Sequence, residues 1–406
     1  MRHARRARGA RRFLPTALAA AGLCALALAG CGGGGDLGAE AAGPRQTAMF
    51  VVSTRRGETP PASEASNDGV GRFSLQFVST PPGHRVGQLE APSIGAPDPA
   101  RHFALVKRRP LDEDGFLTTL ATHLSGRVGS NRDVLLYVHG FNTSYDEARF
   151  RLAQIVEDGR FGGVPALFTW PSTNALLDYG AAKENATISR DALARVIREL
   201  TQTPDVGRVH ILAHSMGSWL TMEALRQNAI AYGPAAGEKL GDVMLAAPDI
   251  DLNVFRQQIS RLDPSHVFVL VAANDRALSL SRTLAGDRPR LGALDPTAPV
   301  DRAALEALGV RVYDLTREAD IFIGHGAYSA PDAVRSIGAQ IAAPRAQDAN
   351  VQSVLGERPV DDRILSTPLS PLAPAAAAAP ALGSAPSSAP APVVAAAAPA
   401  PAAPAP

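Results

Sequence analysis

A serine in the middle of the chain stands where a sharp turn from a strand to a helix would expose its hydroxyl. Residues 209–214 are a run rich in β-formers, and the residues after Ser215 carry apolar side chains at helical spacing. Such a turn needs small residues two places before and two places after the serine, because the helix passes close to the strand. Ala213 and Gly217 occupy these places, with alanine where the strict pattern has glycine. The stretch therefore favours a nucleophilic serine over a serine that only caps the helix.

A serine hydroxyl needs a base to take its proton, and histidine is the usual one. When a serine follows a strand in this way, the acid and the histidine come after it in the chain. Two histidines follow Ser215, namely His266 and His325. His266 precedes a β-rich run, at the wrong edge of a parallel sheet. His325 lies between two glycines after the last β-rich run, and we predict that it is the base.

Three aspartates could hold the imidazole of His325. Asp275 ends the apolar run 267–275, between Ser215 and His325. Asp249 and Asp251 end the preceding run and remain alternatives. We predict Asp275, and we expect the aspartates without this role to cap the helices that follow them.

A tetrahedral intermediate also needs backbone N–H groups aimed at its oxygen. One would come from Met216, the residue after the nucleophile, and the other from Phe141, in the loop after residues 134–140. His139 is expected to orient this loop, and His214 to pack against its neighbours. Trp170 and Tyr179 could line a pocket or serve packing alone.

Strands and helices alternate around these residues. The β-rich runs are apolar on successive residues, which is typical of strands buried on both faces; they are 134–140, 164–170, 209–215, 243–249, 267–275 and 310–316. Helical patterns lie between them, at 145–159, 189–202 (with Ser189 as its cap), 301–310 and 330–342. Two further strands at 49–55 and 72–80 and a helix at 115–126 precede them. This alternation predicts an α/β fold with a mostly parallel central sheet and helices on both faces, whose ligands bind outside the carboxyl ends of the strands.

Six stretches together resemble the α/β-hydrolase superfamily, and more narrowly an uncharacterised bacterial family of α/β hydrolases that are often lipoproteins or secreted. They are "VHGFN", "FTWPS", "SRDAL", "AHSMGSWLTMEAL", "APDIDLNVF" and "NDRALSLS", and the resemblance covers roughly residues 48–342. It implies the α/β-hydrolase fold and a Ser-His-Asp triad. It says little about the substrate, because this fold hosts many reactions.

The two ends of the chain are expected to lie outside the folded domain, residues 47–344. Residues 1–30 have a basic start, an apolar core and small residues at the end, as in a secretory signal peptide. The tetrad that ends at Cys31 resembles a bacterial lipobox, which implies a lipid on Cys31 and a flexible tether over 31–46. Residues 345–406 are rich in alanine and proline, and we expect this tail to be disordered.

Composition narrows the function further. The chain has 406 residues, is 46% hydrophobic and has a formal net charge of +1, so nothing indicates a nucleic-acid partner. Its two cysteines are Cys24 and Cys31, so the folded domain is expected to have no thiolate metal site. We expect a lipid-anchored serine hydrolase of the cell envelope, facing the periplasm or exterior, that needs no metal or cofactor and acts on a small-molecule or lipid acyl ester. The alternatives are a non-catalytic binding or scaffold lipoprotein with the same fold, and an acyltransferase.

Overall fold

The computed structural model describes residues 45–57, 67–172, 178–233, 237–317 and 325–342. The predicted signal peptide, lipidated Cys31, tether and alanine- and proline-rich tail lie outside the described residues. The predicted domain boundaries therefore stay predictions.

One sheet of nine strands organises the described residues, in the order β3-β2-β1-β5-β4-β6-β7-β8-β9. The strands from β1 to β9 along this order pair in parallel, while β2 pairs antiparallel with both β1 and β3. The predicted mostly parallel sheet is thus confirmed, with an antiparallel extension at one edge. The strands are β1 Gln46–Arg55, β2 Asn67–Ser79, β3 Ala104–Leu111, β4 Val134–Val138, β5 Val164–Thr169, β6 Val209–His214, β7 Leu240–Ala246, β8 Val267–Val271 and β9 Arg311–Asp314.

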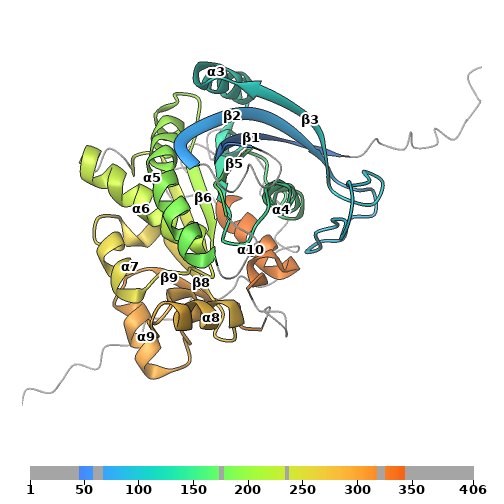
Figure 1. Ribbon diagram of the computed structural model, residues 1–406. Helices are drawn as coiled ribbons and strands as arrows, with labels where there is room; N and C mark the ends of the chain where they lie inside the picture. The colour runs from blue at the N-terminus through green and yellow to red at the C-terminus, as the bar shows by residue number, and fades with distance from the viewer. Residues whose placement is uncertain (1–44, 58–66, 173–177, 234–236, 318–324, 343–406) are drawn as a thin grey trace, which may run out of the picture. The chain divides into compact units, whose positions relative to one another are not determined.

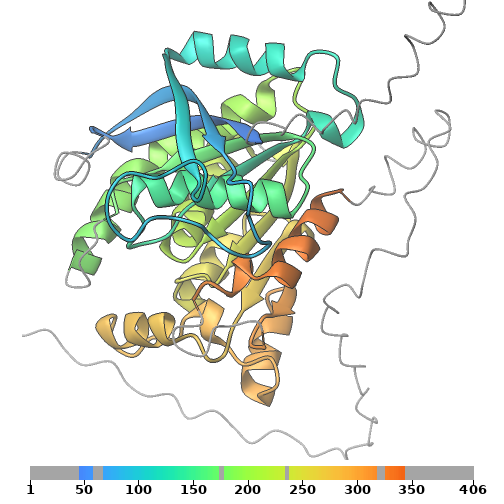
Figure 2. The same ribbon diagram turned by 90° about the vertical axis from the view of Figure 1, so that its right-hand side faces the viewer.

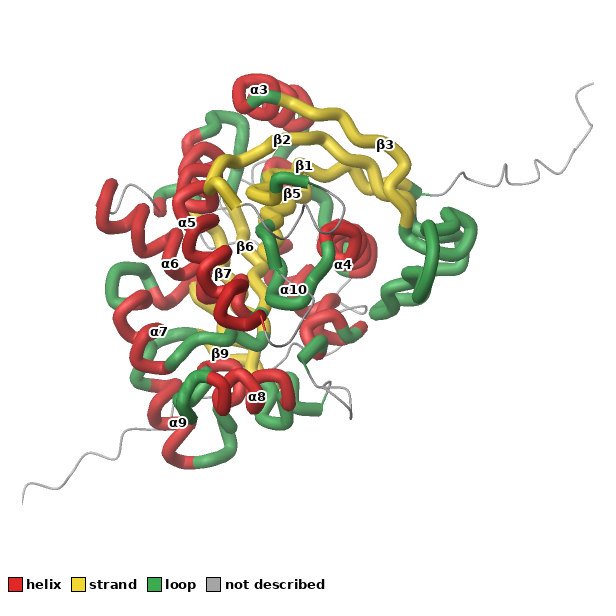
Figure 3. The backbone as a smooth tube through the Cα atoms, viewed as in Figure 1, coloured by secondary structure: helices red, strands yellow, loops and turns green. Residues whose placement is uncertain are grey.

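Helices cover both faces of the sheet, as predicted. In Figures 1 and 3, α5, α6 and α7 lie on one side of the strands, and α4 and α10 lie on the other. α3 packs against the outer strands β2 and β3 (Figures 1 and 2). The helices are α3 Glu113–Leu124, α4 Tyr145–Asp158, α5 Tyr179–Gln202, α6 Met216–Tyr232, α7 Leu252–Ile259, α8 Arg276–Leu284, α9 Pro299–Glu306 and α10 Pro331–Ala342.

The central strands are apolar on successive residues because both of their faces are buried. In β4, Leu136 and Val138 belong to the core that includes α5 and α6, whereas Leu135 and Tyr137 belong to the core that includes α4 and α10. Side chains alternate between the faces of a strand, so each of the two cores requires its own apolar set.

The chain order along the sheet reverses around β4. From β4 the chain runs to β5 on one side and then returns to β6 on the other side of β4. Loops that leave neighbouring strands in opposite directions open a crevice at the carboxyl ends of those strands. The fold therefore places the loop after β4, and Ser215 after β6, at this crevice.

Two elements differ from the sequence prediction. Strand β3 was not predicted, because its exposed edge position tolerates Lys107, Arg108, Arg109 and Pro110, which hide the apolar pattern. Helix α5 begins at Tyr179, ten residues before the predicted cap.

The predicted capping role of Ser189 is wrong. Ser189 is buried within α5, and its hydroxyl donates to the carbonyl of Asn185, one turn earlier. It also lies 2.8 Å from the hydroxyl oxygen of Thr54 and accepts from the amide of Asn67. Ser189 therefore fastens α5 to the β1–β2 edge.

A buried histidine joins the segment after β2 to helix α4. His84 Nδ1 lies 2.7 Å from a carboxylate oxygen of Glu90, and Nε2 lies 2.8 Å from one of Asp158. Burial alone would lower the pKa of His84, but the hydrogen bonds and charges of Glu90 and Asp158 outweigh it and raise the pKa above its usual value. The protonated ring donates to both carboxylates.

This pair of contacts predicts a pH-dependent contribution to stability. Because the pKa of His84 is raised on folding, the contribution is complete below the pKa of the unfolded chain and is lost as the pH rises through the folded pKa. We expect His84→Gln to lower the free energy of unfolding by roughly 1.5–3 kcal/mol at about pH 6, as for hydrogen bonds between charged groups, and by less at about pH 9. Urea unfolding of both proteins at the two pH values measures this. An equal loss at both would contradict it.

Candidate active site

Ser215 occupies a strained turn between β6 and α6. Its φ is 54° and its ψ is −123°, a conformation that side chains other than glycine rarely adopt. Hydrogen bonds hold it there: its N–H donates to Ala246 O at 2.9 Å, and its carbonyl accepts from Ser218 N at 3.0 Å and from Asp249 N at 3.2 Å. A strained residue that its surroundings fix so fully is typical of functional sites.

Two glycines let the backbone pass close to this turn. A Cβ on Gly217 would lie 2.7 Å from the carbonyl oxygen of Val138, so only glycine lets α6 start against the end of β4. A Cβ on Gly140 would lie 2.9 Å from the Cβ of Ser215. The loop after β4 and the turn at Ser215 therefore depend on each other's glycines for their close approach.

The structure brings Asp275 and His325 together. His325 Nδ1 lies 2.7 Å from Asp275 Oδ2, and the Asp275 side chain is fully buried. Asp275 Oδ1 also accepts from Leu278 N at 3.0 Å, so the same carboxylate caps α8. With Nδ1–H donated to Asp275, the lone pair of the His325 ring lies on Nε2.

His214 holds His325 beside the turn at Ser215. Its Nε2–H donates to the carbonyl oxygen of His325 at 3.0 Å, and the two rings lie 4.6 Å apart, centroid to centroid. On its other side, the His214 ring packs on Tyr328 at 4.5 Å. The hydroxyl of Tyr328 lies 2.9 Å from that of Tyr137 in β4. Packing was predicted for His214, but the hydrogen bond to His325 was not.

Three histidines, His139, His214 and His325, lie at the carboxyl ends of the strands and have different electrostatic surroundings. Burial and the nearby Arg55 lower the pKa of His139 to about 3, and burial and the nearby His325 lower that of His214 well below its usual value. Both rings are therefore neutral at neutral pH. Of the three, only His325 has a hydrogen bond to a carboxylate among the described residues.

The loop after β4 is held from behind by buried polar groups. Trp170 N–H donates to Nε2 of His139 at 3.2 Å, which leaves the Nδ1–H of His139 to donate to Gly140 O at 2.9 Å. Arg55 donates to Thr143 O at 2.9 Å. His139 therefore orients the loop, as predicted. Trp170 is fully buried, stacks on His139 and donates its indole N–H to the carbonyl oxygen of His139 at 3.0 Å, so it helps to hold this loop.

The two predicted oxyanion donors lie at the crevice. Met216 is the first residue of α6, and Phe141 follows β4. Within the described residues, neither N–H donates to another backbone carbonyl. First-turn N–H groups have no partner inside their own helix, so that of Met216 is available to a ligand.

Asp249 does not cap a helix, and that expectation is wrong. Its carboxylate is buried and accepts from Tyr179 OH at 2.7 Å and from Ser281 Oγ at 2.6 Å. It also forms an ion pair with Arg290 at 3.2 Å. Asp251 does cap α7, accepting from Asn253 N and Val254 N. The predicted choice of Asp275 over these two matches the contact with His325.

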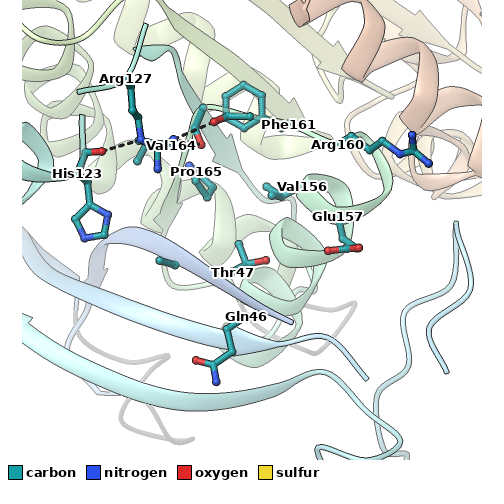
Figure 4. A pocket seen from close by; sticks show the side chains of 13 residues that line it. Gln46, Thr47, His123, Arg127, Val156, Glu157, Arg160, Phe161, Val164 and Pro165 are labelled. Carbon is teal, nitrogen blue, oxygen red and sulfur yellow. Dashed lines mark hydrogen bonds between the residues drawn. The ribbon is translucent and has the colours of Figure 1, made fainter. Parts of the chain in front are cut away.

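A pocket of about 520 Å³ lies at the amino ends of the parallel strands, opposite to the end that carries Ser215. It is lined by Thr47, Val164 and Pro165, at the amino ends of β1 and β5, and by His123 and Arg127 (Figure 4). Ser215 follows the carboxyl end of β6, so this pocket does not serve it. Within the described residues, no group of three potential metal ligands is gathered. None of the described helices is both long and apolar enough to cross a membrane.

Comparison with known proteins places the chain in a family. Residues 112–345 match a family model described as an alpha/beta hydrolase of unknown function (DUF900). The chain belongs to this family of α/β hydrolases. The match covers more than half of the chain and every residue of the candidate site from Gly140 to His325. The predicted fold class and superfamily are thus confirmed, and the family description leaves the activity open.

Individual relatives are more distant from this α/β hydrolase. An uncharacterised protein of a Nostoc species is 39% identical over 61 residues, which is 15% of this chain and only 16% of that protein. A predicted CIB-like hydrolase from Thermoplasma acidophilum is 13% identical, with a TM-score of 0.29, and the match covers 52% of this chain and 87% of that one. An esterase from Pyrobaculum calidifontis is 14% identical, with a TM-score of 0.35 and coverages of 73% and 85%. At these values nothing about their activities transfers to this chain.

Proposed function

We propose that this α/β hydrolase is a serine hydrolase that cleaves carboxylic esters. The observation that carries the proposal is the pairing of His325 with the buried Asp275, at 2.7 Å, beside a serine in a strained turn. This is the arrangement that a serine nucleophile, a general base and an orienting acid require.

The proposed reaction has two halves. His325 Nε2 takes the proton of the Ser215 hydroxyl as the oxygen attacks the ester carbonyl, and then passes it to the leaving alcohol. Asp275 holds the ring and stabilises its protonated form. Water then attacks the acyl group on Ser215 with the same proton transfers in reverse. The N–H groups of Phe141 and Met216 would stabilise the negative oxygen in both halves.

A panel of para-nitrophenyl esters of increasing acyl length tests the proposal. We expect saturable hydrolysis of at least part of the series by the wild-type protein. A folded protein that hydrolyses no ester would favour the alternative of a non-catalytic envelope scaffold. An acyltransferase would instead release nitrophenol faster when an acceptor alcohol is added, with a matching amount of new ester.

The hydrogen bond from His214 to His325 leads us to predict that His214 variants hydrolyse esters more slowly. His214→Phe keeps a ring against Tyr328 but loses the hydrogen bond to His325 O. A misplaced base costs up to about a hundredfold, so we expect kcat/KM to fall by roughly 10- to 100-fold. His214→Gln keeps an N–H donor at a similar reach and is expected to recover most of this loss. Equal rates for the two variants, measured on one ester, would contradict a positioning role.

We also propose that the protein is anchored in the cell envelope by a lipid on Cys31, facing the periplasm or exterior. The support is the sequence around Cys31 alone, which resembles a lipobox. We expect Cys31→Ser to shift the protein to the soluble fraction or to leave an unprocessed precursor. Fractionation with immunoblotting of both forms measures this, and unchanged processing and membrane retention would rule the anchor out.

A further inference from the structure

A lysine next to the candidate site has an amino group that no carboxylate of the described residues contacts directly. Lys183 Nζ lies 3.3 Å from the centre of the Trp219 ring. Within the described residues, the ammonium forms no hydrogen bond and no ion pair. Burial lowers the pKa of Lys183 to about 7, against a partial compensation from Asp249. A partly buried amino group without a carboxylate partner gains more interaction energy from an added anion than a solvated lysine does.

Lys183 lies over Trp219, and Trp219 lies one helical turn after Ser215. Tyr179 and Lys183 are four residues apart on α5, and Ser215 and Trp219 are four residues apart across the start of α6. Residues at this spacing lie on one face, about 5–6 Å apart between Cβ atoms.

Tyr179, one turn before Lys183, is tied to the site by direct contacts. The Tyr179 ring packs edge-on against Phe141 at 5.7 Å, and the Tyr179 hydroxyl donates to Asp249, whose N–H donates to Ser215 O. Helical side chains lean toward the N-terminus of their helix. Since α5 and α6 both begin at the carboxyl ends of the strands, the Cα–Cβ bonds of Lys183 and Trp219 are tilted toward the end of the sheet at which Ser215 lies.

The carboxylates nearest to Lys183 are already paired with other groups. The charge of Asp249 is already matched by Arg290, and two hydroxyls occupy its oxygens. Glu223, one turn beyond Trp219, accepts from Gln258 and acts on Lys183 only at longer range. The wall of the site formed by Tyr179, Lys183 and Trp219 is therefore apolar except for one cation.

We propose that Lys183 forms an anion subsite and that the esters cleaved at Ser215 carry a negatively charged group. This inference rests on the proposed function. The group would be a carboxylate or a similar anion, placed about one helical turn from the reacting carbonyl. Trp219 and Tyr179 would contact the apolar part of the substrate between the two charges.

Three esters test the subsite. Para-nitrophenyl monoglutarate carries a carboxylate on the acyl side, para-carboxyphenyl pentanoate carries one on the alcohol side, and para-nitrophenyl pentanoate is neutral. The measured quantity is the ratio of kcat/KM for each anionic ester to that for the neutral ester. At least one ratio should be higher in the wild-type protein than in a variant without the Lys183 charge. The ester with that ratio shows which side of the substrate carries the anion.

Two variants keep a long side chain over Trp219 and differ from each other in charge. Lys183→Met retains an unbranched chain over Trp219, and the ratio should fall by about tenfold or more, as for the loss of one charge-assisted hydrogen bond. Lys183→Arg keeps the charge and should retain most of the ratio. Lys107→Met is the matched control, because Lys107 is exposed on strand β3 at the edge of the sheet, and it should leave both ratios unchanged.

A second readout uses pH. Because Lys183 loses its proton around neutral pH, the ratio for the preferred anionic ester should decline as the pH rises above about 7, and less so in Lys183→Arg. The proton transfer at His325 affects both esters and cancels in the ratio. Esters that are hydrolysed with ratios independent of Lys183 overturn the subsite alone. If the wild-type protein hydrolyses none of the three esters, the proposed function falls and the subsite falls with it.

Discussion

Replacing Ser215 by alanine is expected to abolish ester hydrolysis. Loss of the nucleophile in a triad costs on the order of 10⁴- to 10⁶-fold in kcat, whereas loss of one oxyanion donor costs only about 3 kcal/mol. The substitution keeps the Cβ that packs toward Gly140 and leaves the backbone strain as it is. The melting temperature should therefore stay close to that of the wild-type protein.

The measurement is kcat for one ester, with thermal unfolding as the control for folding. A folded Ser215→Ala protein that keeps more than about a tenth of the activity would place the nucleophile elsewhere, since no triad serine is dispensable to that degree. Ser218, three residues later, is the matched control. Its hydroxyl already donates to Ala213 O at 2.9 Å, so Ser218→Ala should retain catalysis and lose about 1 kcal/mol of stability.

Replacing Asp275 by asparagine is expected to have the second largest effect. Asparagine keeps the shape and the acceptor for Leu278 N, but it no longer supplies the charge that faces His325 Nδ1. In the serine-protease case this change favours the wrong tautomer of the histidine and costs about 10⁴-fold in kcat. We expect a loss of several orders of magnitude in kcat here, with a small change in melting temperature because the helix cap survives.

Asp249→Asn is the matched control for the choice of acid. It removes the charge that faces the buried Arg290, and breaking such a pair costs about 3–5 kcal/mol of stability. The kcat of Asp249→Asn per folded molecule should stay within about tenfold of the wild-type value, because Asp249 contacts the candidate site only through its backbone N–H and through Tyr179. An active Asp275→Asn beside an inactive but folded Asp249→Asn would reverse the assignment.

The sequence predicted the parallel core of the fold because those strands are buried on both faces. Runs such as Val134–Val138 have no polar positions to obscure them. The edge strand β3 escaped prediction because its exposed face carries arginine and lysine. The first half of α5 escaped because small residues, Ala182 and Ala186, make its buried stripe, and Ser189 has the chemistry of a cap while lying inside the helix.

The candidate site could be predicted in part. The strand–serine–helix turn at Ser215 is a local signal, and the order of serine, aspartate and histidine can be read along the chain. The choice between Asp275 and Asp249 is not local. It depends on which carboxylate meets Nδ1 of His325 and which is already occupied by Arg290, a residue with no recognisable motif. Lys183 and the hydrogen bond of His214 depend likewise on contacts between distant segments, and nothing in their spacing indicates them.

Covalent labelling with a fluorophosphonate tests the central claim, that Ser215 is an activated nucleophile, without knowledge of the substrate. Intact-mass spectrometry of the folded wild-type protein should show one label per chain, and tandem mass spectrometry of the digest should place it on Ser215. Ser215→Ala should take no label, and Asp275→Asn should label far more slowly. A folded wild-type protein that resists the reagent, or a label on another serine that persists in Ser215→Ala, would contradict the account.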